Sequence, residues 1–334
     1  MSDPAAVHAE DALFAARVDA VRSRALTLAK SGSDTISFVY LGTMAAMVLV
    51  SLYLLSVHKP YASVAAFLLL GLFQYYCTIA IHEAYHQGLL TNHRANELLG
   101  TVLAALVTFD FRAMKRAHLR HHATYGGPDD PDRPMYDIVG KFSNVPSFLC
   151  HLVAAPVLGL RESMRNLWMR RDRAETADYR GNLPTIGACQ LCIAIVLYPF
   201  AGILAYPIYW VMPLVLIAGP LLRARTICEH AGLIERFEFG KDRQLRFART
   251  HASSGSCWFL LQRVILSPFN FNFHHEHHSL PTVPYYQLPR LHAALRNIGY
   301  YSRYPENLSG SYFRTIRQEV IEPSRLSREP RPSG

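Results

Sequence analysis

The 334-residue sequence lacks the motifs of a protein that carries its own redox cofactor or binds nucleic acid. It has no CxxCH haem-attachment motif, no four-cysteine iron–sulfur pattern and no GxGxxG loop after a strand. No nucleic-acid-binding motif is present either. Residues 1–35 have neither the apolar core nor the small-residue cleavage site of a secretory signal. Electrons for any redox chemistry would therefore have to come from a separate protein.

Cysteine is also scarce, and its spacing does not indicate a disulfide framework. Most of the six cysteines lie in apolar stretches. Cys189 and Cys192 form a CxxC inside such a stretch, which we interpret as packing in the lipid phase. In a reducing cytoplasm these thiols would stay free. The cysteines are at positions 77, 150, 189, 192, 228 and 257.

Charged residues are absent from several long stretches of a chain that is half hydrophobic. The run Ile36–Val57 has 22 residues without a charge. As a helix it would cover about 33 Å, enough to span the hydrocarbon core of a bilayer. A tight turn, His58-Lys59-Pro60, separates it from a second uncharged run, Tyr61–Ile81. These two runs predict a transmembrane hairpin.

A second hairpin is predicted over Thr185–Leu222, 38 residues that contain four prolines and no charge. We place its turn near Tyr206-Pro207. The apolar segments Asn96–Phe109 and Val145–Leu160 are too short for ordinary spans and suit re-entrant or surface helices. The expected fold is an all-α integral membrane protein with about four transmembrane helices in two hairpins and a cytosolic helical cap.

The sequence divides into three parts. Residues 1–35 are predicted to form a cytosolic or interfacial helix, because apolar residues recur at helical spacing over 5–30. This helix could lie on a membrane surface or pack on the rest of the protein. Residues 36–305 would form the membrane domain, and 306–334 a C-terminal tail. The end of the tail, Glu322–Gly334, is rich in Pro, Arg and Ser and is expected to be disordered.

The net charge of +9 agrees with this topology. In the two-hairpin arrangement 33 of the 34 Lys and Arg residues lie on one side of the membrane, and only Lys59 lies on the other. The positive-inside rule makes the populated side cytoplasmic. We therefore expect a multi-pass protein of a bacterial-type inner membrane, with both termini and all histidine clusters in the cytoplasm. The basic charge is explained without nucleic acid.

Histidines form three clusters next to the predicted spans, within residues 82–86, 118–122 and 274–278. In each cluster they are spaced at i, i+3 or i+4, which aims side chains from one face of a helix. Imidazole is a common ligand for iron, copper and zinc. Together with one histidine after the fourth span, nine candidate ligands result, which suits two metal ions. They are His82, His86, His118, His121, His122, His230, His274, His277 and His278.

The other histidines are interpreted as ordinary surface or core residues. One cluster member, His275, breaks the shared spacing and is expected to point outward or to support a ligand. The residues interpreted as ordinary are His8, His58, His93, His151, His251 and His292.

The first cluster also fits two other metal motifs. His82-Glu83-Ala84-Tyr85-His86 matches HExxH, in which Glu83 would be the general base of a zinc intramembrane metalloprotease. That hypothesis leaves the other two clusters without a role. Glu83-x-x-His86 is half of a ferritin-like di-iron motif, but no second pair occurs in a suitable place. A histidine-rich di-iron site accounts for all three clusters.

The sequence resembles the membrane fatty acid desaturases and their hydroxylase and carotene-ketolase relatives, over roughly residues 60–295. The resemblance rests on HxxxH at 82–86 and HxxHH at 118–122 and 274–278, in this order. It is supported by the flanking sequences Asp129-Asp130-Pro131-Asp132, Ser279–Pro284 and Leu288–His292, and by the pair Glu229-His230.

This resemblance implies four membrane spans, a cytosolic cap and two iron ions, with the nine histidines as ligands. Carboxylates would accept hydrogen bonds from the ligand imidazoles and fix their orientation. The resemblance assigns this role to Glu83, Glu229, Glu276 and Asp132.

The implied reaction is O₂-dependent desaturation of an acyl chain, with iron and O₂ supplying an oxidant strong enough for an unactivated C–H bond. Electrons would come from a ferredoxin, rubredoxin or cytochrome-type donor and its reductase. A lipid or terpenoid hydroxylase or a carotenoid ketolase on the same scaffold is the first alternative. The zinc metalloprotease and a metal-binding membrane protein without catalysis are more distant alternatives.

Overall fold

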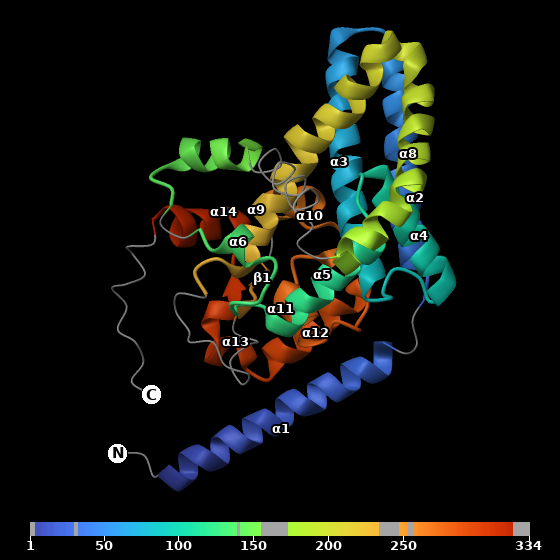
Figure 1. Cartoon of the computed structure of the whole chain (residues 1–334). Helices are drawn as coiled ribbons and strands as arrows, with labels where there is room; N and C mark the ends of the chain where they lie inside the picture. Colours follow the sequence, from blue (N-terminus) through green and yellow to red (C-terminus); the bar gives the residue numbers. More distant parts are fainter. Residues whose placement is uncertain are drawn as a thin grey trace.

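The computed structural model describes residues 4–29, 33–138, 141–154, 173–233, 247–252 and 257–322. Nearly all regular structure in these ranges is helical. Two short parallel strands, β1 (Thr250–His251) and β2 (Leu308–Ser309), pair with Thr250 opposite Leu308. Figure 1 shows several long helices at one end of the molecule and, at the other end, a group of shorter helices with the long N-terminal helix beside it.

Four helical segments in the described ranges are long and apolar enough to cross a membrane. They form two hairpins that stand side by side (Figure 1). This confirms the predicted fold class, an all-α membrane protein. The segments are Thr35–Ser56, Pro60–Tyr85, Asn182–Leu204 and Pro207–His230.

The first hairpin consists of α2 (Thr35–Ser56) and α3 (Pro60–Tyr85). Its turn contains His58 in a left-handed conformation with φ 52°, and Pro60 occupies the first turn of α3. Proline is favoured there because the first helical N–H has no intrahelical partner. Most of α2 is exposed and would face lipid, whereas the second half of α3 is buried. α3 therefore forms the centre of the membrane domain and carries the first histidine cluster at its end.

The second hairpin is less regular. It consists of α8 (Arg173–Ala201), η1 (Gly202–Leu204), two π-helical segments and α9 (Gly219–His230). The π-helical segments, η2 (Pro207–Val211) and η3 (Leu214–Ala218), each start at or directly after a proline. Proline cannot donate the regular helical hydrogen bond, so helical geometry changes near it.

α3 and η3 lie very close together. A Cβ atom added to Gly71 of α3 would lie 2.5 Å from the Cβ of Ile217. No ordinary side chain fits at that distance, so the absence of a side chain at Gly71 permits this contact.

The short helix α4 (His93–Leu106) ends among the spans. Its last carbonyls have no partner within the helix and would be costly to leave unpaired in an apolar environment. Gln190 donates to the carbonyls of Ala105 and Leu106, and the indole of Trp210 donates to Leu106 at 3.1 Å. Side chains of the second hairpin thus satisfy the end of a helix that is too short to span.

The second short apolar segment is described only in part. It is helical over Val145–Ala154, and the remainder of the predicted stretch, up to residue 160, lies outside the described residues.

The shorter helices form the cap that holds the second and third histidine clusters (Figure 1). They include α5 (Phe111–Thr124), α6 (Arg133–Tyr136), α10 (Cys257–Ile265), η5 (Pro268–Asn270), α11 (His274–Ser279), η6 (Tyr285–Gln287), α12 (Leu288–Asn297) and α13 (Tyr300–Arg303).

Helix α1 (Pro4–Ala29) packs on the cap, on the side away from the hairpins (Figure 1). Val18 joins a small apolar cluster with Leu291 and Leu295 of α12. Phe14 stacks on Tyr300 with ring centroids 6.3 Å apart. Of the two arrangements that the sequence allowed for this helix, the structure has the packed one.

The C-terminal segment up to residue 322 is also part of the cap. It contains η7 (Pro305–Asn307), β2, α14 (Tyr312–Thr315) and η8 (Ile316–Ile321). Val320 of η8 is fully buried in a cluster with Ile227 of α9. The structure packs the part of the predicted tail up to residue 322 against α9 and β1. Of the stretch Glu322–Gly334, for which disorder is expected, residues 323–334 lie outside the described residues.

Candidate metal centre

The first histidine cluster lies in the last turn of α3. His82 and His86 are one helical turn apart and therefore point to the same side. α3 ends at Tyr85, with His86 as the C-cap residue. The cluster sits where the second span enters the cap.

The second cluster lies on α5, which begins beside Asp110. The side chain of Asp110 accepts a hydrogen bond from the backbone N–H of Ala113 and caps the helix. Of the histidines that α5 carries, His118 and His122 turn toward the first cluster, and His121 turns toward α9 and α11. One helix thus supplies ligands to two different groups.

The third cluster lies on the six-residue helix α11, and all its histidines are buried. Before it, Phe269 and Asn270 have left-handed backbone angles with φ 57° and 54°. This conformation is rare for residues other than glycine. It reverses the chain just ahead of α11, which faces both α3 and the end of α9.

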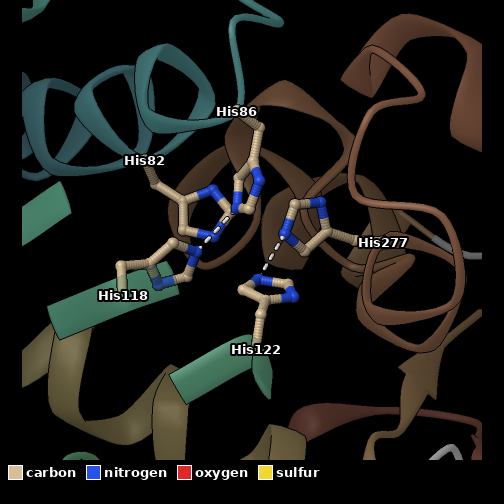
Figure 2. Close-up of side chains that lie close together, drawn as sticks. All are labelled: His82, His86, His118, His122 and His277. Atoms are coloured by element: carbon tan, nitrogen blue, oxygen red, sulfur yellow. Dashed lines mark hydrogen bonds between the residues drawn. The ribbon is translucent and has the colours of Figure 1, made fainter. Parts of the chain in front are cut away.

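Five histidines from three helices form group one. Nε2 of His86 lies 2.7 Å from Nε2 of His118, and Nε2 of His277 lies 3.2 Å from Nε2 of His122. Figure 2 shows the five rings pointing toward one another. One potential ligand atom of each lies within 4.8 Å of all the others. The members of group one are His82, His86, His118, His122 and His277.

The other four predicted ligands form group two. One ligand atom each of His121, His230 and His278 lies within 4.8 Å of the others. His274 joins through its Nε2, which lies 3.0 Å from Nε2 of His230. The structure thus brings together all nine histidines that the sequence predicted, divided five and four.

The spacing of these nitrogens fits metal ions. Two nitrogens bound to one ion at about 2.1 Å lie roughly 3.0 Å apart when they subtend a right angle. The closest pairs, 2.7 to 3.2 Å apart, are in this range. Nε2 of His82 and both ring nitrogens of His278 are buried and have no hydrogen-bond partner among the described residues. Buried polar atoms are rarely left unpaired, and a metal ion would satisfy them.

Burial also favours the neutral form of imidazoles in group one, the form that binds a metal ion. It lowers the pKa of His86 to about 3, with smaller contributions in the same direction from Lys115 and His121. Burial holds the pKa values of His118 and His277 well below the usual range, and neighbouring imidazoles lower them further. Lone pairs of these three histidines are thus available at neutral pH.

Several ligand rings are fixed through the nitrogen that faces away from their group. Nδ1 of His121 lies 2.8 Å from Oδ1 of Asp130, and Nδ1 of His230 lies 2.7 Å from the carbonyl oxygen of Phe247. Nδ1 of His82 lies 3.3 Å from Oε1 of Glu83. Such partners set the tautomer of a ligand and direct its other nitrogen to the metal.

Two of the predicted orienting carboxylates form no hydrogen bond with a candidate ligand ring that the structure describes. Asp132 is 3.8 Å from Nδ1 of His121, beyond hydrogen-bond distance, and the closer carboxylate belongs to Asp130. The reason is local: the backbone N–H of Asp132 donates to Asp130, in a loop in which Gly126 has φ 79°.

Glu276 contacts residues that surround α11 and no ligand ring that the structure describes. It accepts hydrogen bonds from Thr250 and Tyr301, and Nδ1 of His292 lies 2.6 Å from its Oε1. Glu276 therefore anchors α11 to the cap. His292, interpreted from the sequence as an ordinary residue, is thus a partner of Glu276, and its place in the flanking sequence Leu288–His292 was the available signal.

The structure also bears on the HExxH hypothesis. His82 and His86 do not stand alone, because three histidines from α5 and α11 complete the same group. Glu83 lies beside His82, with its Oε1 3.3 Å from Nδ1 of that ring.

Four apolar spans and two buried histidine groups in the adjoining cap define an integral membrane protein with a histidine-rich site that fits metal ions. The chain belongs to the fatty acid desaturase family: the family profile described as "Fatty acid desaturase" matches residues 59–309. The chain is also similar to the dihydrorhizobitoxine desaturase of Bradyrhizobium elkanii, with 25% identity over 236 residues. This similarity covers 67% of the chain and 64% of the relative, slightly less than two thirds of that protein's length.

Proposed function

We propose that the protein is an O₂-dependent membrane di-iron desaturase that introduces a double bond into an acyl chain with electrons from a separate donor. The observation that carries this proposal is the division of nine histidines, six of them buried and three half-buried, into two adjacent groups. Membership of the fatty acid desaturase family supports it, as does the name of the relative, a desaturase of dihydrorhizobitoxine.

Two iron ions held by the groups would supply the oxidising power that removal of hydrogen from an unactivated carbon requires. The protein's own residues hold and orient the ligands. Asp130 and the carbonyl of Phe247 fix two rings of group two, and Glu83 fixes His82 of group one. Burial of the groups excludes water, which protects reactive species from side reactions.

The substrate of this proposal is a lipid with a long acyl chain, and the electron donor is a ferredoxin, rubredoxin or cytochrome-type protein with its reductase. The proposed location is a bacterial inner membrane, with the cap and both termini in the cytoplasm. The concentration of Lys and Arg on the cap side of the hairpins supports this orientation. Basic residues there also suit an acidic donor, because opposite charges speed the encounter.

The test is the lipid profile of a bacterial host that expresses the protein, measured by mass spectrometry. A lipid that lacks two hydrogens is expected with the wild type and not with His277→Ala, which removes a group-one ligand. His8→Ala is the matched control, since His8 is exposed on α1 and distant from both groups. A lipid that instead gains one oxygen would contradict desaturation and identify a hydroxylase or ketolase.

Metal analysis of the purified protein tests the cofactor independently. Two irons per chain are expected in the wild type and in His8→Ala, and fewer in His277→Ala. One zinc per chain, unaffected by changes in group two, would contradict the di-iron proposal and favour the metalloprotease.

A further inference from the structure

Two glutamates border the histidine groups, and both are almost fully buried, at 1% exposure each. Glu83 lies beside group one and Glu229 beside group two. The resemblance to desaturases gives both the same role, that of a carboxylate that orients an imidazole. The atoms that they approach are different.

Glu83 has the position of an orienting residue. Its Oε1 lies 3.3 Å from Nδ1 of His82. The other ring nitrogen, Nε2, has no partner among the described residues and is the one left for a metal ion. The carboxylate therefore touches the side of the ring that faces away from the ion, as is usual for orienting groups.

Glu229 approaches the opposite side of a ring. Nδ1 of His230 donates a hydrogen bond to the carbonyl of Phe247 at 2.7 Å. Nε2 is therefore the nitrogen of His230 that remains for a metal ion. Nε2 of His274 lies 3.0 Å from that atom and must face the same ion. Oε2 of Glu229 lies 3.6 Å from this Nε2 of His274. The carboxylate thus stands on the metal side of both imidazoles.

The distance between the carboxylate of Glu229 and the ring of His274 excludes an orienting role for Glu229 in this structure. At 3.6 Å, Oε2 of Glu229 and Nε2 of His274 are too far apart for a hydrogen bond. They are close enough to bind one ion together, and one oxygen of Glu229 lies within 4.8 Å of the ligand nitrogens of both His230 and His274.

A buried arginine holds the carboxylate in place. Nη1 of Arg225 lies 3.0 Å from Oε1 of Glu229, one helical turn away on α9. The guanidinium also lies over the ring of Phe271, 4.0 Å from its centroid. Arg225 thus engages one carboxylate oxygen and leaves Oε2 directed at group two. It also compensates the charge of the carboxylate, which would be costly to bury alone.

We propose that Glu229 is a ligand of an ion in group two, together with His230 and His274, whereas group one offers five imidazoles. This rests on the proposed pair of metal ions. Because a carboxylate is anionic and imidazoles are neutral, the two ions have different electrostatic environments. The ion in group two is therefore the one that more readily holds the higher charge.

The test is the iron content and the ⁵⁷Fe Mössbauer spectrum of the anaerobically reduced protein, for wild type and variants. Wild type should hold two irons with two distinct quadrupole doublets of equal area. Glu229→Gln should lose one iron on gel filtration in chelator-containing buffer, or should shift one doublet and leave the other unchanged. Glu97→Gln is the control: it removes a carboxylate on α4 whose described partners, Lys115 and Gln87, lie outside both groups, and it should keep two irons and both doublets.

Glu229→Gln leaves the buried Arg225 without its partner and could fail to fold for that reason alone. Arg225→Gln and the double variant Arg225→Gln/Glu229→Gln separate the two effects. The single Arg225 variant should keep two irons, and the double variant should lose the group-two iron. If the double variant or Glu229→Gln retains two irons with both doublets of the wild type, Glu229 is not a ligand. If the wild type itself binds no iron, the proposed function fails, and not merely this assignment.

Discussion

Asp130 is the residue on which the orientation of group two depends most. Its side chain accepts from His121 at 2.8 Å, from the backbone N–H of Gly126 at 3.1 Å and from the backbone N–H of Asp132 at 2.9 Å. The hydroxyl of Tyr136 donates to it as well. One carboxylate thereby connects a ligand ring to the loop that follows α5.

Replacing Asp130 by Asn should weaken metal binding at group two. An amide is uncharged and a poorer acceptor for the N–H of His121, and loss of such partners typically costs about 10–100-fold in metal affinity. Competition with a chelator measures the effect, with Asp132→Asn as the control. Equal effects of both changes would contradict the assignment of Asp130 as the orienting residue.

His251 gives the protein a pH dependence that does not involve the ligands. It is buried, its ring stacks on Tyr312 with centroids 4.0 Å apart, and its Nε2 contacts Thr315 at 3.1 Å. Burial, and secondarily the charge of Arg249, hold the pKa of His251 well below its ordinary value. His251 therefore binds a proton in the unfolded chain at pH values where it stays neutral in the folded chain. The free energy of unfolding consequently falls as the pH drops below about 6.5.

His251→Gln should accordingly flatten the decline of the melting temperature between about pH 7 and pH 5.5. Scanning calorimetry or dye-based melting of the detergent-solubilised protein measures this decline, and His8→Gln on exposed α1 serves as the control. An unchanged slope in His251→Gln would show that this histidine is not protonated on unfolding.

At this scale the sequence predicted well which histidines lie together and predicted poorly the residues that form hydrogen bonds with them. Helical spacing alone places His118 and His122 on one face of a helix, and the structure agrees. The choice between Asp130 and Asp132 depends on the conformation of an irregular loop, which no periodic pattern encodes. The partners of Glu276 come from β1 and the helices after α11, and their approach is a matter of tertiary packing.

Among the elements, α3 and η3 pack so closely at Gly71 that a larger residue has no room there. Gly71→Ala would bring its Cβ to 2.5 Å from Cβ of Ile217, so the helices must move apart. Overpacking of this kind costs about 1–3 kcal/mol. A lower melting temperature in detergent is the expected result. Gly42→Ala on α2, where a Cβ meets nothing within 4 Å, is the matched control and should melt like the wild type.

The elements themselves were predicted closely where hydropathy determines them. The predicted runs Ile36–Val57 and Tyr61–Ile81 became α2 (Thr35–Ser56) and α3 (Pro60–Tyr85). α3 extends beyond its apolar run because it carries the first histidine cluster into the cap. The π-helical segments of the fourth span were not predicted, since prolines indicate irregularity without specifying its form.

For the whole molecule, the proposed topology would put both ends of the described chain and the histidine groups on one side of the membrane. In a chain without native cysteines, His8→Cys should be protected from a membrane-impermeant maleimide in intact cells, and His58→Cys should be labelled. His8 lies on α1 and His58 in the turn of the first hairpin. After lysis both positions should react. Labelling of His8→Cys in intact cells would contradict the proposed cytoplasmic orientation.

The whole-molecule arrangement could be predicted in outline, because apolar runs and charge placement determine topology. The packing of α1 on α12 and of residues 305–322 on the cap could not. Both depend on contacts between segments far apart in the sequence. One example is the side chain of Asn307, which donates to the carbonyl of Ala248 at 2.7 Å.

The short helix α11 supplies His277 to group one, and His274 and His278 to group two. Each group therefore lacks a ligand until the ribosome has passed residue 278, after all four spans have been synthesised. Spans can enter the membrane during translation, because chains fold from the N-terminal end onward. In the proposed di-iron protein, complete metal sites would form only at a late step of biogenesis, on a chain that is already anchored in the membrane.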